Sequence, residues 1–292
     1  MNNIEQKIGF DRIRMMVAEE CSNALALRMT DEMRFESRYE TVAQLLRQTD
    51  EMRRIVLFGN GFPSQDFIDL SDDLAALRIE NTAISQEALF NLKCSLRTIT
   101  ACLEYLHVDD GEDPEYPELT TLAKDVNLNP TLQKTAGKIV DDRGDIYDNA
   151  SPDLLEIRRQ MERKRQSVDI YLHRALVRAK QEGWTAENAE PTIRDGRMVI
   201  PLLDTHRRKL KGLIHGESAT RQTAYVEPAE VVEINNDLRE LEFAERREIE
   251  RILLHFSNLL RPELDELKKA YWFLARIDFV RAKARVAIAL DA

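Results

Sequence analysis

Seven basic side chains gather in one short stretch of the sequence, where they are suited to binding phosphate groups. Residues 191–226 contain these seven Lys and Arg residues but only three Asp and Glu residues. Such side chains bind backbone phosphates, which gives position but little sequence readout. Because Trp184 and Tyr225 stand alone, the stretch lacks the aromatic row that stacks single-stranded bases, and contact with a duplex backbone is favoured. The candidate nucleic-acid-binding residues are Arg194, Arg197, Arg207, Arg208, Lys209, Lys211 and Arg221.

The charge of the whole chain makes this stretch unusual. The 292 residues carry a net charge of −10. Residues 1–150 hold 16 basic and 28 acidic side chains, residues 151–226 hold 15 and 10, and residues 227–292 hold 11 and 14. A positive segment inside a negative chain is what local contact with phosphate requires. A solvated basic helix face is the alternative interpretation, and the charge pattern alone leaves both open.

Motifs for other chemistries are missing from the sequence. It has no GxxxxGK[ST] phosphate-binding loop and no GxGxxG, so we expect no enzyme activity from this chain. The five histidines lack the spacing of metal ligands, and no metal or cofactor is expected. Cys21, Cys94 and Cys102 form no CxxC pair and are interpreted as buried free thiols. Without a signal peptide or an apolar run of about 18 residues, the protein is expected to be cytoplasmic and away from membranes.

The elements that must position the basic residues are two long helices and a few short strands. Ser151-Pro152 is an N-cap followed by Pro at the first helical position, and no Gly or Pro follows until Gly183. A second stretch free of Gly and Pro runs from Pro228 to Leu260. Between them, Asp195-Gly196 supplies the positive φ angles of a tight hairpin. Short strands are expected at 192–194, 197–200, 213–215 and 223–226.

These elements predict a mainly α fold. The two long helices are expected to be antiparallel, with the small β element at their far end, which is the architecture of a lever. Before them, apolar residues recur every three or four positions and indicate a body of short helices. The acidic residues 109–113 are interpreted as a solvated turn.

Several blocks of sequence, in order along the whole chain, carry a resemblance to a known family. The blocks are Asn2–Arg14, Gln48–Arg53, Asp145–Leu154 with Ile157–Gln160, Thr192–Pro201, Gly212–Ala219 and Tyr225–Asn236. Together they resemble the amino-terminal half of the type II bacterial MutS paralogue family, which lacks a mismatch-reading domain. In place of that family's usual Ser-Gly-Ala-Thr or Ser-Gly-Gln-Thr, this sequence has Thr220-Arg-Gln-Thr223. A charged Arg thus replaces a flexible Gly in a turn.

The resemblance implies a domain organisation. Its parts are a helical core domain at residues 1–150, an ascending lever helix at 151–190, a β-rich clamp at 191–227, a descending lever helix at 228–261, and a helix returning to the core at 262–292. In full-length relatives an ATPase domain, a basic linker and a small nuclease-like domain follow, and this chain is expected to stop before them. ATP and magnesium are therefore expected only in that ATPase domain.

The resemblance also implies partners and a function. The family forms homodimers and is associated with branched DNA and with ribosomal RNA on collided ribosomes. We expect a lever and clamp segment that grips duplex or branched DNA through its backbone, in a protein of ATP-dependent DNA repair or recombination control. A helical dimerisation scaffold and a clamp for ribosomal RNA stay open as alternatives. Phe243-Ala-Glu245 matches a mismatch wedge, but in mid-helix Phe243 is interpreted as a packing residue.

Overall fold

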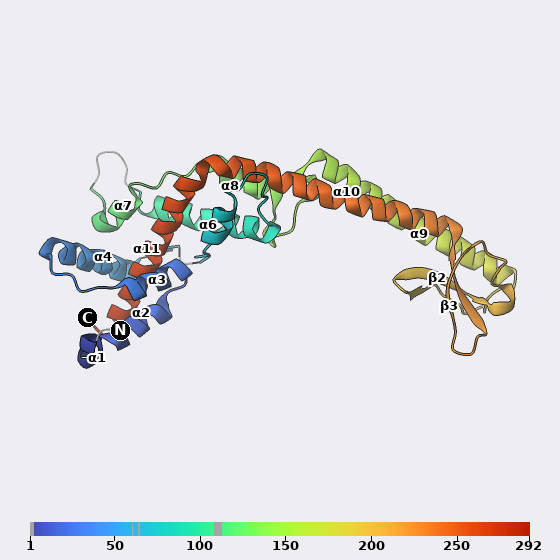
Figure 1. The fold of residues 1–292 in the computed structure, drawn as a ribbon, viewed down its shortest axis with the longest axis horizontal. Coiled ribbons are helices and arrows are strands. Elements are labelled where there is room, and N and C mark those ends of the chain that lie inside the picture. The colour runs from blue at the N-terminus through green and yellow to red at the C-terminus, as the bar shows by residue number, and fades with distance from the viewer. Residues whose placement is uncertain (1–2, 60, 64, 108–112) are drawn as a thin grey trace. The chain divides into compact units, whose positions relative to one another are not determined.

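Helices make up most of the chain in the computed structural model, which describes residues 3–59, 61–63, 65–107 and 113–292 (Figure 1). Within these residues the structure also contains one small antiparallel sheet, and this combination confirms the predicted, mainly α fold class. Most of the predicted turn at 109–113 lies outside the described residues. Throughout the described part of the chain, no helix combines the length and apolar composition that crossing a membrane needs.

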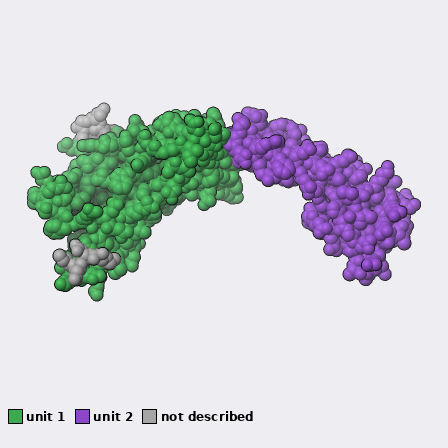
Figure 2. All heavy atoms as spheres, viewed as in Figure 1, with its two compact units in different colours: residues 1–147, 253–292 green, residues 148–252 purple. Residues whose placement is uncertain are grey.

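The chain divides into two units, which are coloured separately in Figure 2. Unit 1 comprises residues 1–147 and 253–292, and unit 2 comprises residues 148–252. Each unit contains one of the two tryptophans, Trp272 in unit 1 and Trp184 in unit 2. Fluorescence can therefore follow the unfolding of each unit separately.

Unit 1 is a helical body built around its last helix, α11. The helix α6 is capped by Ser85, whose hydroxyl accepts a hydrogen bond from the Ala88 amide at 3.1 Å. Met52, Ile99 and Phe273 from three different helices meet in its core and are almost fully buried. The helices of unit 1 are α1 (Asn3–Ile8), α2 (Phe10–Glu20), α3 (Ala24–Glu32), α4 (Tyr39–Phe58), α5 (Ser71–Ala76), α6 (Gln86–Tyr105), α7 (Pro117–Ala123), α8 (Pro130–Ile139) and α11 (Leu264–Ala289), with a 3₁₀ turn at Arg261–Glu263.

A buried ion pair ties α11 to the turn between α2 and α3. Asp278 is fully buried, and its Oδ2 accepts hydrogen bonds from the backbone amides of Ser22 at 2.7 Å and Asn23 at 2.8 Å. Its Oδ1 lies 3.0 Å from Nη2 of Arg281, whose guanidinium carbon sits 4.8 Å from the centre of the Phe67 ring. A single carboxylate therefore satisfies two backbone donors and one cation in the interior of unit 1.

The three cysteines are free thiols. Cys94 and Cys102 are buried as expected, whereas Cys21 is only partly buried. Burial raises the pKa of Cys102 to about 12, and it raises the pKa of Cys21 to about 12 with a further contribution from the negative charge of Asp278. A thiol with a raised pKa stays protonated at neutral pH and is a poor nucleophile.

Unit 2 is built on two long helices, α9 (Pro152–Gln181) and α10 (Ala229–Leu260), of which α10 continues into unit 1. Ser151 caps α9 as predicted, because its hydroxyl accepts a hydrogen bond from the Leu154 amide at 3.0 Å. Residue numbers rise along α9 as those of their partners on α10 fall, so the helices are antiparallel (Figure 1). The pairs that show this are Ser151–Glu248, Arg158–Glu245 and Lys164–Asp237, at 2.5, 2.7 and 2.5 Å.

Polar groups occupy the middle of this helix pair. Two hollows of about 540 and 400 Å³ open there, and charged side chains line much of both. Lys164, Glu230 and Glu233 line the larger hollow, and Arg159 and Arg165 line the smaller one. Charged side chains therefore share the packing between the two helices along this stretch.

The described strands form one sheet at the end of the helix pair. They are β1 (Thr192–Arg194), β2 (Arg197–Leu203), β3 (Gly212–Glu217) and β4 (Thr223–Pro228), in the order β1-β2-β4-β3, with antiparallel neighbours. The φ angles of Asp195 and Gly196 are 50° and 72°, which confirms the predicted hairpin turn. One face of the sheet packs on the helices through Ile200, Leu202, Val226, Leu172, Leu176, Val231 and Ile234.

Phe243 corrects one prediction from the sequence. Its side chain is 58% exposed on α10, and the guanidinium carbon of Arg246 lies 4.7 Å from the ring centre. The interpretation of Phe243 as a packing residue was therefore wrong. In a layer of only two helices, each helix buries a single stripe, and a large apolar residue outside that stripe stays in solvent.

Candidate nucleic-acid interface

The sheet distributes the predicted basic residues over its two ends and one connection. Arg194 and Arg197 are register partners on either side of the β1–β2 turn, and Arg221 lies in the β3–β4 turn. Because β2 and β3 both pair antiparallel with β4, they run in the same direction, and residues 204–211 must return the length of the sheet to join them. This connection carries the other four residues, Arg207, Arg208, Lys209 and Lys211.

Carboxylates hold two of the seven residues. Nη1 of Arg207 lies 3.0 Å from Oδ1 of Asp204 and 3.0 Å from Oε1 of Glu217. Nη1 of Arg197 lies 3.6 Å from Oε1 of Glu227, and the Arg197 side chain is only 18% exposed. These two guanidinium groups stabilise the connection and the sheet, and less of their charge is available to an external phosphate.

Four other residues are open to a ligand. Arg208, Lys209, Lys211 and Arg221 are exposed, and no carboxylate of the described residues lies within ion-pair distance of them. The backbone at Lys211 is anchored to the start of α10. The carbonyl of Lys211 accepts a hydrogen bond from the Ala229 amide at 2.9 Å, at the point where α10 begins. These four side chains can therefore meet phosphates without first breaking an ion pair.

Arg194 adds a fifth cation in a defined geometry. Its guanidinium carbon lies 4.3 Å from the centre of the Tyr225 ring. Register places both residues on the sheet face away from the helices, because Arg194 is opposite Arg197 and Tyr225 is opposite Pro201, while the alternate residues of β2 enter the core. A guanidinium stacked on a ring keeps its edge donors free, which suits bidentate contact with a phosphate. Tyr225, which stands alone in the sequence, thus supports one of the candidate residues.

Reasoning from sequence missed a buried carboxylate at the end of β4. The Glu227 side chain is only 2% exposed. Its Oε2 lies 2.6 Å from Nε2 of His215 on β3, and its Oε1 accepts a hydrogen bond from Nδ2 of Asn235 on α10 at 2.7 Å. With Arg197, these residues form the Glu227 hub, which joins two neighbouring strands and a helix to β4. A Glu between the buried residues Val226 and Pro228 is the only signal that the sequence offered.

The turn that departs from the family pattern has a left-handed residue at the substituted position. Arg221 has a φ angle of 55°. Its amide donates to the Ser218 carbonyl at 2.8 Å, and the Thr223 amide donates to the Ser218 hydroxyl at 3.2 Å. The turn therefore forms with Arg in a conformation that costs an L-residue roughly 1–2 kcal/mol and costs Gly almost nothing.

Replacing Arg221 by Gly is expected to stabilise unit 2 by about 0.5–1 kcal/mol. The relief of the left-handed strain exceeds the conformational entropy that Gly adds to the unfolded chain. Urea unfolding followed through Trp184, in a Trp272→Phe background, measures this change. Arg208→Gly is the matched control, since Arg208 is equally exposed and has no positive φ. An equal effect of both substitutions would contradict the interpretation.

No candidate metal site lies in the described part of the chain. Among the described residues, no group of three or more His, Cys, Asp and Glu side chains is arranged to hold a metal ion. The sheet instead presents exposed cations outside ion pairs, at Arg194, Arg208, Lys209, Lys211 and Arg221, in a chain whose net charge is −10.

Similarity to known proteins extends over nearly the whole length of this chain. It is 32% identical over 285 residues to the endonuclease MutS2 of Thermomicrobium roseum, which is 98% of this chain and 36% of that protein. It is 27% identical over 285 residues to the endonuclease MutS2 of Alkaliphilus oremlandii, with the same coverage. It is 29% identical over 294 residues to that of Leuconostoc citreum, which is 100% of this chain and 36% of the relative.

These relatives are MutS2 proteins, which agrees, at the level of the family, with the resemblance found in the sequence. The chain spans about a third of the length of the curated relatives it matches. No family model matches the chain.

Proposed function

We propose that unit 2 is a lever and clamp that grips duplex or branched DNA by its backbone, as part of a MutS2-like protein. The observation that carries the proposal is the set of exposed cations on the sheet, Arg194, Arg208, Lys209, Lys211 and Arg221, in a chain of net charge −10. Similarity to MutS2 proteins supports a nucleic acid as the ligand. For the parent protein we propose ATP-dependent DNA repair or recombination control, a homodimeric state, and an ATPase domain that binds ATP and magnesium.

The proposed grip relies on phosphates and not on bases. Each phosphate that a cation neutralises releases counterions, so log affinity falls with log salt at a slope of about −0.9 per contact. About four simultaneous contacts give a slope between roughly −3 and −4. Sequence preference is expected to be absent, because contacts to the backbone carry little sequence information. Binding to a single copy should have a Kd of roughly 10⁻⁴ to 10⁻⁶ M at physiological salt.

Reversing the open cations is expected to abolish binding. In the Arg208→Glu, Lys209→Glu, Lys211→Glu variant, affinity for a fluorescent four-way DNA junction should fall by more than about 100-fold at low salt, because three attractive contacts become repulsive. Fluorescence anisotropy over a salt titration measures both the affinity and its slope. The variant should unfold like the parent, since exposed charges away from ion pairs contribute little to stability.

A matched reversal on the helix pair controls for net charge. Arg239, Arg246 and Arg247 are exposed on α10, and their replacement by Glu changes the total charge equally. If the control loses as much affinity as the sheet variant, long-range charge and not a grip explains binding. If the sheet variant binds like the parent, the proposal fails. Ribosomal RNA offers the same phosphate chemistry, so an RNA hairpin in a parallel titration tests which nucleic acid is preferred.

A further inference from the structure

Helix α11 is buried on most sides and carries one stripe of side chains that is exposed at Lys268, Trp272 and Arg276 and partly buried at Phe279 and Lys283. The five residues of this stripe are spaced four, four, three and four positions apart, which places them on one face of the helix. Trp272 is 49% exposed, Arg276 is exposed, and Phe279 is partly buried. We call this set the α11 stripe; it consists of Lys268, Trp272, Arg276, Phe279 and Lys283.

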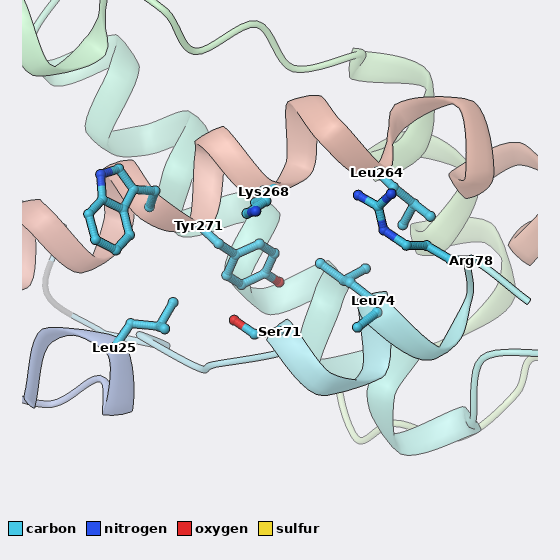
Figure 3. A pocket seen from close by; sticks show the side chains of 9 residues that line it. Leu25, Ser71, Leu74, Arg78, Leu264, Lys268 and Tyr271 are labelled. Carbon is cyan, nitrogen blue, oxygen red and sulfur yellow. The ribbon is translucent and has the colours of Figure 1, made fainter. Parts of the chain in front are cut away.

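Two hollows in unit 1 share Trp272 as a wall; the first is lined mostly by apolar groups, and the second by apolar and charged groups. The first has a volume of about 300 Å³, and Figure 3 shows Leu25 and Leu74 among its lining residues, on either side of the buried Tyr271 ring. The second has a volume of about 320 Å³, and Leu122 and Phe273 are among its lining residues. Each is at the lower limit for a small-molecule site and suits one or two apolar side chains better than a whole ligand.

The cations of the stripe lack carboxylate partners. Among the described residues, none of the ion pairs includes Lys268, Arg276 or Lys283, whereas Arg78 and Lys269 beside the stripe are paired with Asp265 and Glu266. Burial, with added repulsion by Arg276, lowers the pKa of Lys283 to about 8. The ammonium of Lys283 lies 5.0 Å from the centre of the Phe279 ring. The stripe thus combines three cations that no ion pair of the described residues holds with exposed aromatic surface at Trp272.

We propose that the α11 stripe binds an acidic amphipathic segment of a partner protein. Apolar side chains of that segment enter the two hollows beside Trp272, and its carboxylates meet Lys268, Arg276 and Lys283. Trp and Arg are the residues that most often dominate the binding free energy of protein interfaces. Apolar anchors three or four residues apart, as on a bound helix, match two hollows separated by a single side chain.

Charge complementarity favours such a segment over a nucleic acid. Asp125 lines the second hollow, and Asp265 and Glu266 lie beside the stripe in their ion pairs. A phosphate chain carries charge at every step and would be repelled by these carboxylates, while leaving the apolar walls of both hollows uncovered. A peptide can place carboxylates only where cations are free. The proposal is independent of the clamp, because every residue it uses lies in unit 1.

Selection from a random peptide library tests the proposal. A phage library of about 16-residue peptides is selected on the 292-residue chain and depleted on its Trp272→Ala, Arg276→Glu variant. Enriched peptides should be net acidic, with apolar residues three or four positions apart. A synthetic copy of an enriched peptide should bind the Trp272→Ala and Arg276→Glu single variants at least tenfold more weakly than the parent in fluorescence anisotropy. The pKa of Lys283, measured by NMR, should rise when the peptide binds.

Control variants distinguish peptide binding at the α11 stripe from non-specific binding and from binding at the clamp. Phe35→Ala and Lys134→Glu remove an exposed aromatic residue and a cation elsewhere in unit 1, and they should leave peptide binding unchanged. The clamp variant with Arg208, Lys209 and Lys211 reversed should also bind the peptide normally. No enrichment, or enrichment of basic or uncharged peptides, would overturn the proposal. So would oligonucleotide binding or self-association that is lost on Trp272→Ala.

Discussion

Asp278→Ala is expected to destabilise unit 1 by about 3–5 kcal/mol, the typical cost of removing one partner from a buried ion pair. The substitution removes the carboxylate that lies 3.0 Å from Nη2 of Arg281, and it removes the acceptor of the Ser22 and Asn23 amides. The loss is large because desolvated donors and charges then find no water to replace the missing group. Urea unfolding followed through Trp272, in a Trp184→Phe background, measures the change.

An exposed ion pair on the same helix provides the control. Asp265 pairs with Arg78 at 2.7 Å, but their side chains are 81% and 59% exposed. Asp265→Ala should therefore cost at most about 1 kcal/mol. Separate fluorescence probes matter, since a chain of two units need not unfold in one transition. A loss below about 1 kcal/mol in Asp278→Ala would show that the buried pair does not hold the α2–α3 turn to α11.

Glu227→Ala is expected to destabilise unit 2 by about 3 kcal/mol and to weaken nucleic-acid binding with it. Removing the carboxylate takes away the group that Arg197 and Asn235 contact at 3.6 and 2.7 Å. Because Lys211 immediately precedes β3, and β3 is joined to β4 through His215, the cations of the connection also lose their fixed position. Unfolding followed through Trp184 and anisotropy with the DNA junction measure the two effects.

Glu217→Ala is the matched control and should act in the opposite direction on binding. Glu217 pairs with Arg207 at 3.0 Å, and both side chains are 37% exposed. Its loss should cost unit 2 less than about 1 kcal/mol. It also frees Arg207 from one of two carboxylates, so affinity for the junction should rise. Equal losses of affinity in Glu217→Ala and Glu227→Ala would contradict the roles assigned to the two carboxylates.

Local sequence signals predicted the main elements correctly. Ser151-Pro152 marked the start of α9 because a cap acts on the next three residues, and Asp195-Gly196 marked the β1–β2 turn because positive φ angles select these residue types. Short helices give weaker signals: the nine residues of α3 span too few turns to show a clear periodic stripe.

Contacts between side chains that are distant in the sequence could not be predicted from it. The candidate cations were named by charge alone, and nothing local distinguishes Arg208, which is free, from Arg207, which two carboxylates hold. The partners of Asp278 on the α2–α3 turn lie more than 250 residues away in the chain. Glu227 meets side chains from a strand and a helix that only the folded sheet brings together. Such contacts depend on topology, which a one-dimensional pattern does not contain.

The polar middle of the α9–α10 pair gives the pair uneven mechanical compliance. Lys164 bonds to Asp237, but Glu233, one helical turn away on α10, lines the same hollow. Bending the pair makes the helices slide past each other locally, and a slide of about 5.4 Å would pass the ammonium from one carboxylate to the next. Half-exposed pairs of this kind differ by little more than about 1 kcal/mol. Next to the sheet, where Leu172 and Val231 pack in the apolar core, the same slide would open cavities, so we expect this end of the pair to resist sliding more strongly.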